Sequence, residues 1–278
     1  MFSVVQISDS HVSPRITHFN ANWEAARALL PRLSPDLIVH TGDATLDGAD
    51  MEADCAMAAA GLADLPAPLR VVPGNHDVGD LGAATQPPTA ARIARHERHF
   101  GPCVWTEDRP GWRLLGLNSQ VIGAGDGGDE AQRAVIEEVI ATLGPRRLAV
   151  FLHKPMFLDA VEEGPVGYWA VPPDVRAPVR RLLDHPNLRL VASGHLHIAR
   201  LTTHGPATVA WCPATSFTLG GKLMADARGG DRRLGVMRHV FREDSVETEV
   251  IAIPDSRHLV LDDMIDEIYP PAPAAAGS

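Results

Sequence analysis

Short apolar runs rich in β-branched residues alternate with longer segments of helical period over the first 190 residues. The short runs predict strands at residues 4–7, 37–40, 69–72, 113–117, 148–152 and 188–192. The longer segments predict helices at residues 22–33, 51–62, 89–100, 130–143 and 174–183. Strands joined by crossover helices usually form parallel sheets that are covered on both faces. The pattern therefore predicts an α/β fold with a largely parallel sheet system.

The pattern changes after residue 197, where strand-like runs follow one another without helices between them. These runs lie at residues 208–212, 234–241 and 246–253, and we expect them to be antiparallel. Together the two halves predict two sheets packed face to face, with helices outside each sheet. Because no composition shift divides the chain, residues 1–254 are predicted to form one domain and residues 255–278 a C-terminal extension. The Pro- and Ala-rich run from Pro270 predicts flexibility at its end.

The composition narrows the class of protein. Hydrophobic residues make up 45% of the chain and charged residues 22%, which allows a globular core. The formal net charge of −10 disfavours a broad basic surface for nucleic acid. No apolar stretch is long enough for a membrane span and the N-terminus lacks a basic region with a cleavage site, which predicts a cytoplasmic location. Cys55, Cys103 and Cys212 lie far apart and are expected to be buried free thiols.

Polar residues with metal-binding chemistry follow five of the predicted strands. They are Asp9 and His11 after the first strand, Asp43 after the second, Asn75 and His76 after the third, His153 after residues 148–152, and His195 and His197 after residues 188–192. Binding sites of open α/β sheets form beyond the carboxyl ends of strands, where residues distant in sequence meet. We therefore expect these side chains to converge in one site.

Without His76, this set contains two aspartates, one asparagine and four histidines, and it has no cysteine. Hard and borderline divalent metals prefer such carboxylate, amide and imidazole ligands. Two metals about 3.5–4 Å apart hold a phosphate oxygen, lower the pKa of a bound water and stabilise in-line displacement at phosphorus. The Asp43 carboxylate is suited to bridge two metals because it has two oxygens and a negative charge. The set thus predicts a two-metal centre for phosphate ester hydrolysis.

Five short segments carry a resemblance to a known family. They are Asp9-Ser10-His11, Gly42-Asp43, Gly74-Asn75-His76-Asp77, His153-Lys154-Pro155 and Gly194-His195-Leu196-His197. In order and spacing they resemble the five motifs of the calcineurin-like metallophosphoesterase superfamily. The short chain and the early first motif resemble the bacterial class III cyclic nucleotide phosphodiesterases and the related glycerophosphodiesterases. The resemblance implies an α/β fold that is a four-layer α/β/β/α sandwich of two mixed sheets flanked by helices.

The resemblance also implies roles for the motif residues. One metal would be held by Asp9, His11, Asp43 and His197, and the second by Asp43, Asn75, His153 and His195. His76 would be catalytic, donating a hydrogen bond to a phosphoryl oxygen or protonating the leaving alkoxide, with Asp77 orienting its ring. The implied cofactors are two divalent or trivalent metal ions per chain, Mn, Fe or Zn foremost, with Co, Ni or Mg as alternatives. Gly42, Gly74 and Gly194 are explained by sharp turns or close backbone approach.

The implied function is a phosphodiesterase that hydrolyses a small phosphodiester, such as a cyclic nucleotide or a glycerophosphodiester, by attack of a metal-bound hydroxide. Two alternatives stay open, a phosphomonoesterase on the same metal site and a non-catalytic metal-binding scaffold. Val78, Gly79 and Asp80 follow the third motif, near which protein phosphatase relatives carry arginines, and this disfavours that branch. Nucleic acid is disfavoured as a partner, and a homodimer through the C-terminal strands is compatible with the sequence.

Substrate class is expected to depend on residues around the fourth motif. Lys154 stands where many diesterase relatives have a second histidine, and it either binds the substrate phosphate or faces solvent. The Pro- and Gly-rich segment of residues 156–173, which contains Tyr168 and Trp169, is expected to border the pocket. Loops held between ligand-bearing strands commonly carry binding residues.

Overall fold

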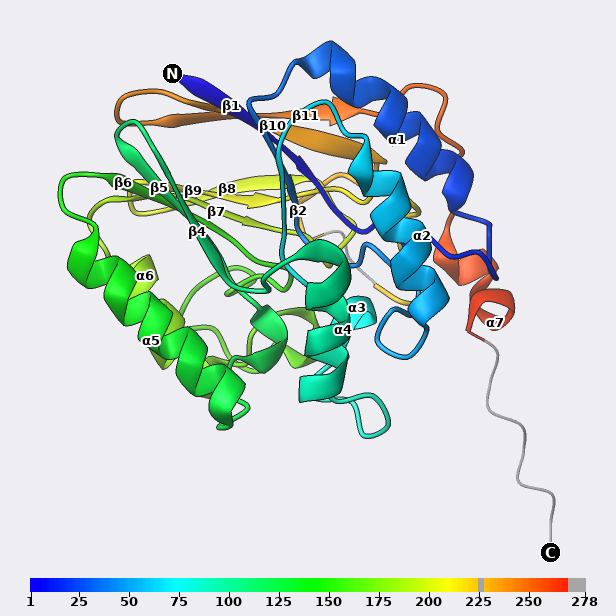
Figure 1. The fold of residues 1–278 in the computed structure, drawn as a ribbon, viewed down its shortest axis with the longest axis horizontal. Helices are drawn as coiled ribbons and strands as arrows, with labels where there is room; N and C mark the ends of the chain where they lie inside the picture. Colours follow the sequence, from blue (N-terminus) through cyan, green and yellow to red (C-terminus); the bar gives the residue numbers. More distant parts are fainter. Residues whose placement is uncertain (225–227, 270–278) are drawn as a thin grey trace, which may run out of the picture.

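Two β-sheets lie face to face in the computed structural model, which describes residues 1–224 and 228–269 (Figure 1). The first sheet has the order β11-β10-β1-β2-β3, with β1 (Phe2–Ile7), β2 (Leu37–His40), β3 (Leu69–Val71), β10 (Gly235–Phe241) and β11 (Val246–Ala252). The second sheet has the order β4-β5-β6-β7-β9-β8, with β4 (Trp105–Arg109), β5 (Trp112–Gly116), β6 (Arg147–Phe151), β7 (Leu188–Ser193), β8 (Arg200–His204) and β9 (Ala207–Trp211).

Helices cover the outer face of each sheet (Figure 1). The first sheet is covered by α1 (Asn20–Leu33) and α2 (Glu52–Ala63), and the second by α5 (Gly127–Thr142) and α6 (Ala177–Leu183). The remaining helices are α3 (Asn75–Val78), α4 (Ala90–Phe100), α7 (Ile265–Ile268) and the 3-10 turns η1 (Ser119–Val121), η2 (Gly167–Trp169), η3 (Pro173–Val175) and η4 (Leu261–Asp263).

Apolar side chains from the two inner sheet faces form the central core. Val4 and Leu37 of the first sheet belong to one buried cluster with Leu114, Phe151 and Ala192 of the second. Two outer clusters join α1 and α2 to the first sheet and α5 and α6 to the second. Burying the apolar stripe of each helix against a sheet face is what stabilises this layering. The predicted four-layer α/β/β/α sandwich of two mixed sheets is therefore confirmed.

Strand directions differ from the prediction in one place. β1, β2 and β3 are parallel, and β10 pairs antiparallel with β1 and β11, as expected. β9, which was expected to be antiparallel, pairs antiparallel with β8 on one side but parallel with β7 on the other. The hydrophobic pattern does not predict β4 and β8, which are the edge strands of the second sheet. The exposed positions of β4 carry polar residues, as is usual where an edge must not pair with another chain, whereas those of β8 are Leu201 and Thr203.

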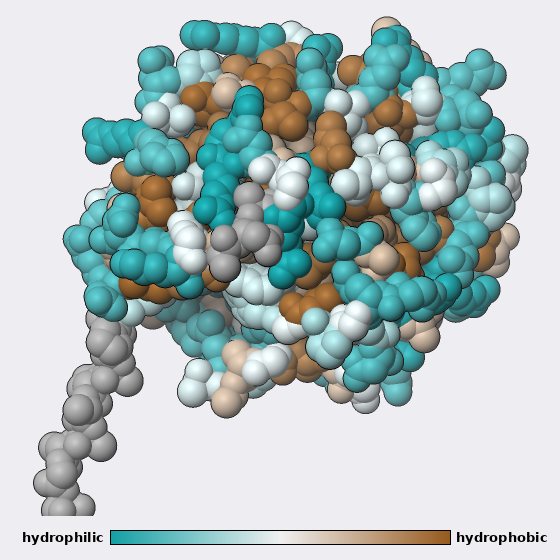
Figure 2. Space-filling view, turned by 180° about the vertical axis from the view of Figure 1, so that it is seen from behind, coloured by the Kyte–Doolittle hydropathy of each residue, from teal (hydrophilic) through white to brown (hydrophobic). Residues whose placement is uncertain are grey.

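The first part of the C-terminal extension packs against the domain. Leu261 of η4 and Ile268 of α7 are buried in a cluster with Leu46 and Phe217. The end predicted to be flexible, from Pro270 onward, lies outside the described residues. The surface seen in Figure 2 is mostly hydrophilic, with hydrophobic residues scattered between.

Two further predictions concern cysteines and membrane helices. All three cysteines are buried and free, as predicted. None of the helices in residues 1–224 and 228–269 combines the length and the apolar character that a membrane crossing needs.

Candidate metal centre

The candidate ligands leave their strands on turns with a left-handed backbone. Positive φ angles between 47° and 71° occur at Asp9, His11, Asp43, His195 and His197. Such conformations are uncommon for residues that carry a Cβ and cost free energy. Hydrogen bonds between the turns hold them: the Asp9 N–H donates to the Gly42 carbonyl and the His11 N–H to the Asp43 carbonyl. Backbone strain of this kind concentrates at functional sites.

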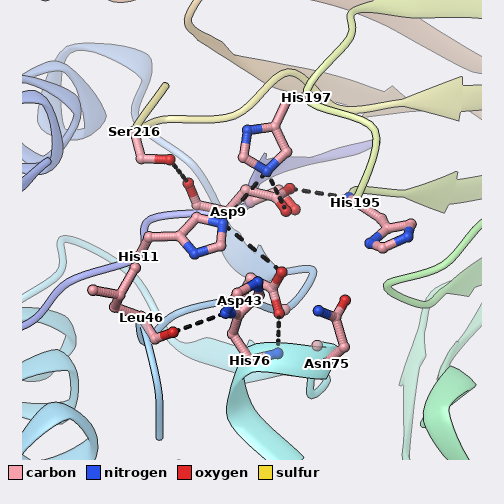
Figure 3. A network of polar contacts seen from close by, with 12 residues as sticks. Asp9, His11, Asp43, Leu46, Asn75, His76, His195, His197 and Ser216 are labelled. Carbon is pink, nitrogen blue, oxygen red and sulfur yellow. Dashed lines mark hydrogen bonds and ion pairs between the residues drawn. The ribbon is translucent and has the colours of Figure 1, made fainter. Parts of the chain in front are cut away.

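The first group of side chains contains Asp9, His11 and His197 (Figure 3). His197 Nε2 lies 3.3 Å from Asp9 Oδ1 and 3.4 Å from His11 Nε2. His11 Nε2 lies 3.8 Å from Asp43 Oδ2, which places Asp43 beside this group. All four side chains are buried, and Asp9 Oδ1 has no hydrogen-bond donor among the described residues. Atoms suited to bind a metal thus converge from the ends of β1, β2 and β7.

The second group is centred on His153 Nε2. This atom lies 3.2 Å from Asp43 Oδ2, 3.1 Å from Asn75 Oδ1 and 3.2 Å from His195 Nδ1. The Asn75 side-chain nitrogen donates to Tyr168 Oη at 2.9 Å, which turns the amide oxygen toward His153. Asp43 Oδ2 is therefore common to both groups.

Backbone carbonyls determine which nitrogen of His153, His195 and His197 faces the centre. Three such hydrogen bonds are present, from His153 Nδ1 to Thr41 (2.8 Å), from His197 Nδ1 to Phe217 (2.8 Å) and from His195 Nε2 to Tyr168 (3.1 Å). A neutral imidazole that donates from one nitrogen keeps a lone pair on the other. The inward nitrogens are therefore acceptors, which is the orientation that outer hydrogen bonds give to metal-binding histidines.

Acceptors that face one another in a buried site need a cation between them, because their lone pairs otherwise lack donors. A proton is one such cation. Burial lowers the pKa of His153, but the carboxylates of Asp43 and Asp9 raise it to about 9. Burial also holds the pKa values of His11 and His195 well below the usual value, so both rings are neutral, as metal-binding imidazoles must be. This donor set fits borderline metal ions.

His76 lies beside the first group and lines the cavity next to it. Its backbone N–H donates to Asp43 Oδ1 at 2.8 Å, so that Oδ2 is the oxygen nearest the histidine nitrogens. Its ring Nδ1 donates to the Leu46 carbonyl at 2.8 Å, and the ring centre lies 4.7 Å from that of His11 (Figure 3). The Leu46 carbonyl therefore orients the His76 ring.

Asp77 forms no hydrogen bond with the His76 ring in the described part of the chain, which corrects the prediction that it orients this ring. Its buried carboxylate accepts hydrogen bonds from the Thr45 N–H (3.0 Å), the Thr45 hydroxyl (2.7 Å), the Gly74 N–H (2.9 Å) and the Ala44 N–H (3.3 Å). Asp77 thus ties the turn that carries Asp43 to the turn that carries Asn75. The sequence motif could not separate this role from an orienting one, since Asp77 directly follows His76.

Two motif glycines allow backbone to approach the candidate ligands. A Cβ on Gly74 would lie 2.7 Å from Asp43 Cγ, and a Cβ on Gly194 would lie 2.6 Å from Asp9 Oδ2. Both distances are far shorter than an ordinary van der Waals contact. The expected close approach at these glycines is therefore confirmed.

A cavity of about 190 Å³ lies beside the two groups. Tyr168 and Trp169 form part of its wall, which confirms that the segment of residues 156–173 borders the site. Residues beyond the motifs complete it, namely Phe217, Leu219, Leu223, Leu261, Ile265 and Tyr269. Sequence reasoning missed them. The i, i+4 spacing of Leu261 and Ile265 indicates a helix face, but nothing local in the sequence points that face at the site.

Lys154 does not face solvent, so that alternative is wrong. Its side chain is 9% exposed, and its Nζ lies 2.6 Å from Asp80 Oδ2. The same ammonium lies 4.7 Å from the centre of the Tyr168 ring. The pair belongs to the wall of a second, larger cavity on the other side of Tyr168.

Residues 2–199, which carry all the candidate ligands, match the calcineurin-like phosphoesterase family. The chain belongs to this family. It is therefore a hydrolase of phosphoric esters, as predicted.

Similar proteins include diesterases and a phosphatase. A probable cyclic nucleotide phosphodiesterase of Synechococcus sp. is 27% identical over 224 residues, which cover 77% of this chain and 81% of that protein. A probable glycerophosphodiester phosphodiesterase of Arcobacter nitrofigilis is 24% identical over 238 residues, covering 81% of this chain and 82% of its own. The structure of a dimetal phosphatase from Danio rerio has a TM-score of 0.61 at 14% identity, covering 90% of this chain and 96% of its own, and shares the fold.

Proposed function

We propose that this chain is a two-metal phosphodiesterase that hydrolyses a small phosphodiester. The observation that carries the proposal is the pair of buried acceptor groups that share Asp43 Oδ2. One metal would be held by Asp9, His11, Asp43 and His197, and the other by Asp43, Asn75, His153 and His195. Mn, Fe and Zn accept such mixed imidazole and oxygen ligands. When bound, two such ions lower the pKa of a water and offset charge on the phosphate.

His76 is the residue we expect to act on substrate. Its Nδ1 is held by the Leu46 carbonyl, so its Nε2 is the nitrogen that reaches the reacting group. A protonated His76 would donate from Nε2 to a phosphoryl oxygen or to the leaving alkoxide. Asp77 supports this arrangement at a distance by joining the two turns that carry Asp43 and His76.

Two observations favour a diester over a monoester. The part of the wall of the 190 Å³ cavity that the structure describes contains no lysine or arginine, which a doubly charged monoester would favour. Its apolar residues, including Phe217, Leu219 and Leu261, suit an uncharged organic ester group. The activities named for the relatives from Synechococcus and Arcobacter, both diesterases, support the same choice.

The test compares a diester with a monoester that share one leaving group. Protein reconstituted with Mn²⁺ is assayed on bis(p-nitrophenyl) phosphate and on p-nitrophenyl phosphate, with bound metal counted by mass spectrometry. We expect two metals per chain and a higher kcat/KM for the diester. A higher value for the monoester would favour the phosphomonoesterase alternative, and two bound metals without turnover of either ester would favour the scaffold.

Site variants test the assigned roles with matched controls. Asp43→Asn should lose metal and activity together, whereas His76→Gln should keep both metals and lose about 10²–10⁴-fold in kcat. Asp64→Asn and His258→Gln make the same chemical changes at exposed positions and should leave both quantities unchanged. Wild-type turnover by Asp43→Asn and His76→Gln would contradict the mechanism. The cytoplasmic location and the homodimer stay predictions.

A further inference from the structure

A second cavity, of about 430 Å³, lies next to the candidate metal centre, and we call it the side cavity. Its walls come from the turn of residues 80–83, from Ser119, Gln120 and Ile122, from Lys154 and from the loop around Tyr168. Tyr168 lines both the side cavity and the smaller cavity beside the metal groups. Its hydroxyl accepts from Asn75, whose amide oxygen faces His153. The side cavity thus begins one side chain away from the candidate metal ligands.

The charged groups of the side cavity neutralise each other. Lys154 Nζ and Asp80 Oδ2 are 2.6 Å apart, and their side chains are 9% and 13% exposed. The other described residues of its wall carry no charge. A charged ligand would have to compete with this buried pair, which is costly to break. The side cavity therefore favours an uncharged group.

Gln120 supplies an acceptor that lacks a donor. The residue is 1% exposed, and its Oε1 has no hydrogen-bond partner among the described residues. Its Nε2 lies 3.4 Å from Ser119 Oγ, which already accepts from the Lys154 N–H. A buried polar atom without a partner costs free energy, and a ligand N–H or O–H removes that cost. Gln120 thus favours a ligand that carries a donor, which its buried Oε1 would accept once the side chain turns toward the side cavity.

The mouth of the side cavity is apolar. Leu81 is 41% exposed and Tyr168 46% exposed, and they are two of the four exposed large hydrophobic residues in the described parts of the chain. Behind them, Ile122 and Val171 are buried apolar wall residues. Exposed apolar side chains that gather at one cavity mark a binding surface rather than ordinary surface scatter. A ligand with a flat or apolar body would cover them.

We propose that the side cavity binds the ester group that stays on phosphorus while the phosphate lies at the metal centre, an inference that rests on the proposed function. The group is an uncharged alcohol of about nucleoside size with an apolar ring and at least one N–H or O–H donor. The volume lies within the range of small-molecule sites, which is about 300–1,000 Å³, and a glycerol group would leave most of it unfilled.

The position of His76 indicates which ester group enters the side cavity. His76 lines the cavity beside the metal groups but not the side cavity. A residue that protonates the leaving alkoxide must be within hydrogen-bond reach of it. The leaving group therefore lies on the His76 side, and the retained group extends past Tyr168 into the side cavity.

The test fills the side cavity and leaves the metal centre intact. Ala83 lines the side cavity and Ala84, the next residue, does not, so Ala83→Leu and Ala84→Leu form a matched pair. The Mn²⁺-loaded enzymes are assayed on two esters with one leaving group, thymidine 5′-(p-nitrophenyl phosphate) and methyl p-nitrophenyl phosphate. We expect Ala83→Leu to lower kcat/KM for the thymidine ester about tenfold or more while the methyl ester is unaffected. Ala84→Leu should change neither value, and an equal effect of Ala83→Leu on both esters overturns the inference.

Gln120→Met tests the donor requirement with a side chain of similar length. Wild type should prefer the thymidine ester to its N3-methylated analogue, which lacks the N–H, and Gln120→Met should lose that preference. Equal preference in wild type and variant contradicts the assigned role of Gln120.

Binding of thymidine to the side cavity can also be measured without turnover. Thymidine is titrated into wild type, Ala83→Leu and Ala84→Leu, and its affinity for each protein is measured by calorimetry. If neither ester is hydrolysed, the proposed function fails. Thymidine binding that only Ala83→Leu abolishes then still supports the side cavity, and absent or equal binding in all three proteins overturns it.

Discussion

Replacing Gly74 with alanine adds one methyl group at the most crowded point of the metal centre. Gly74 has φ −99° and ψ −177°, an extended conformation that alanine adopts without strain. The added Cβ would lie 2.7 Å from Asp43 Cγ, whereas ordinary contacts begin at 3.4 Å. The Gly74 N–H is held by the buried Asp77 carboxylate at 2.9 Å, which keeps this backbone in place. The Cβ would also overlap the Asp43 backbone nitrogen, so moving the carboxylate alone cannot relieve the overlap, and the turn that carries Asp43 must shift by about 1 Å.

Such a shift has two consequences of different size. Overpacking of a buried site typically costs about 1–3 kcal/mol, so the chain should still fold. A displacement of about 1 Å at a positioned group costs about 100-fold in rate, and Asp43 is the oxygen donor common to both groups. We therefore expect Gly74→Ala to lose bound metal and about 100-fold in kcat/KM for bis(p-nitrophenyl) phosphate, with a small decrease in Tm.

The matched control is Gly127→Ala, at the first position of α5. A Cβ there would meet no atom within 4 Å, so folding, metal content and turnover should match wild type. Metal content is measured by mass spectrometry after dialysis, folding by circular dichroism and Tm by thermal unfolding. A Gly74→Ala protein with two metals and wild-type kcat/KM would refute the reasoning that the glycine exists to make room for Asp43.

Three further predictions concern stability. Mn²⁺ at about 100 times its Kd should add about 2.7 kcal/mol per site, seen as a higher Tm in wild type but much less in Asp43→Asn. Asp77→Asn should lower the free energy of unfolding in urea by about 1–3 kcal/mol, because an amide nitrogen would face the N–H donors of the two turns; an unchanged urea midpoint would exclude this tie. Burial, with a smaller effect of His99, lowers the pKa of His96 to about 3 from 6.5. The folded state therefore loses stability as pH falls below 6.5, by about 2 kcal/mol at pH 5, and His96→Leu should remove that loss; parallel pH profiles for wild type and variant would contradict it.

Much of the fold is predictable from local pattern. Buried strands such as β2 and β6 are continuous apolar runs between turn residues, and their predicted bounds agree with the structure to within one residue. The edge strands β4 and β8 are half exposed, so their polar residues resemble a loop. The direction of β9 depends on its pairing with β7 and β8 across the chain, which no local period encodes.

The candidate ligands are likewise readable in the sequence, because each follows a strand whose carboxyl end meets the others at one sheet edge. The motif did not decide the role of Asp77. The Leu46 carbonyl, and not Asp77, orients the His76 ring, and the two come together only in the folded chain. The side cavity could not be predicted from the sequence either. Gln120 and Lys154 come together there from separate strand ends, and neither shows locally that it lines a pocket.

The sequence by itself determined the buried strands and the long helices, the two-sheet architecture and the identity of the residues that could bind metal. These depend on apolar period and on turn chemistry, which act between residues close in the chain. Only the tertiary structure decided which carbonyls orient His153 and His197, how the C-terminal extension completes the wall and where a second ester group could lie. Those features arise from packing between distant segments, where side chains meet partners that no local pattern specifies.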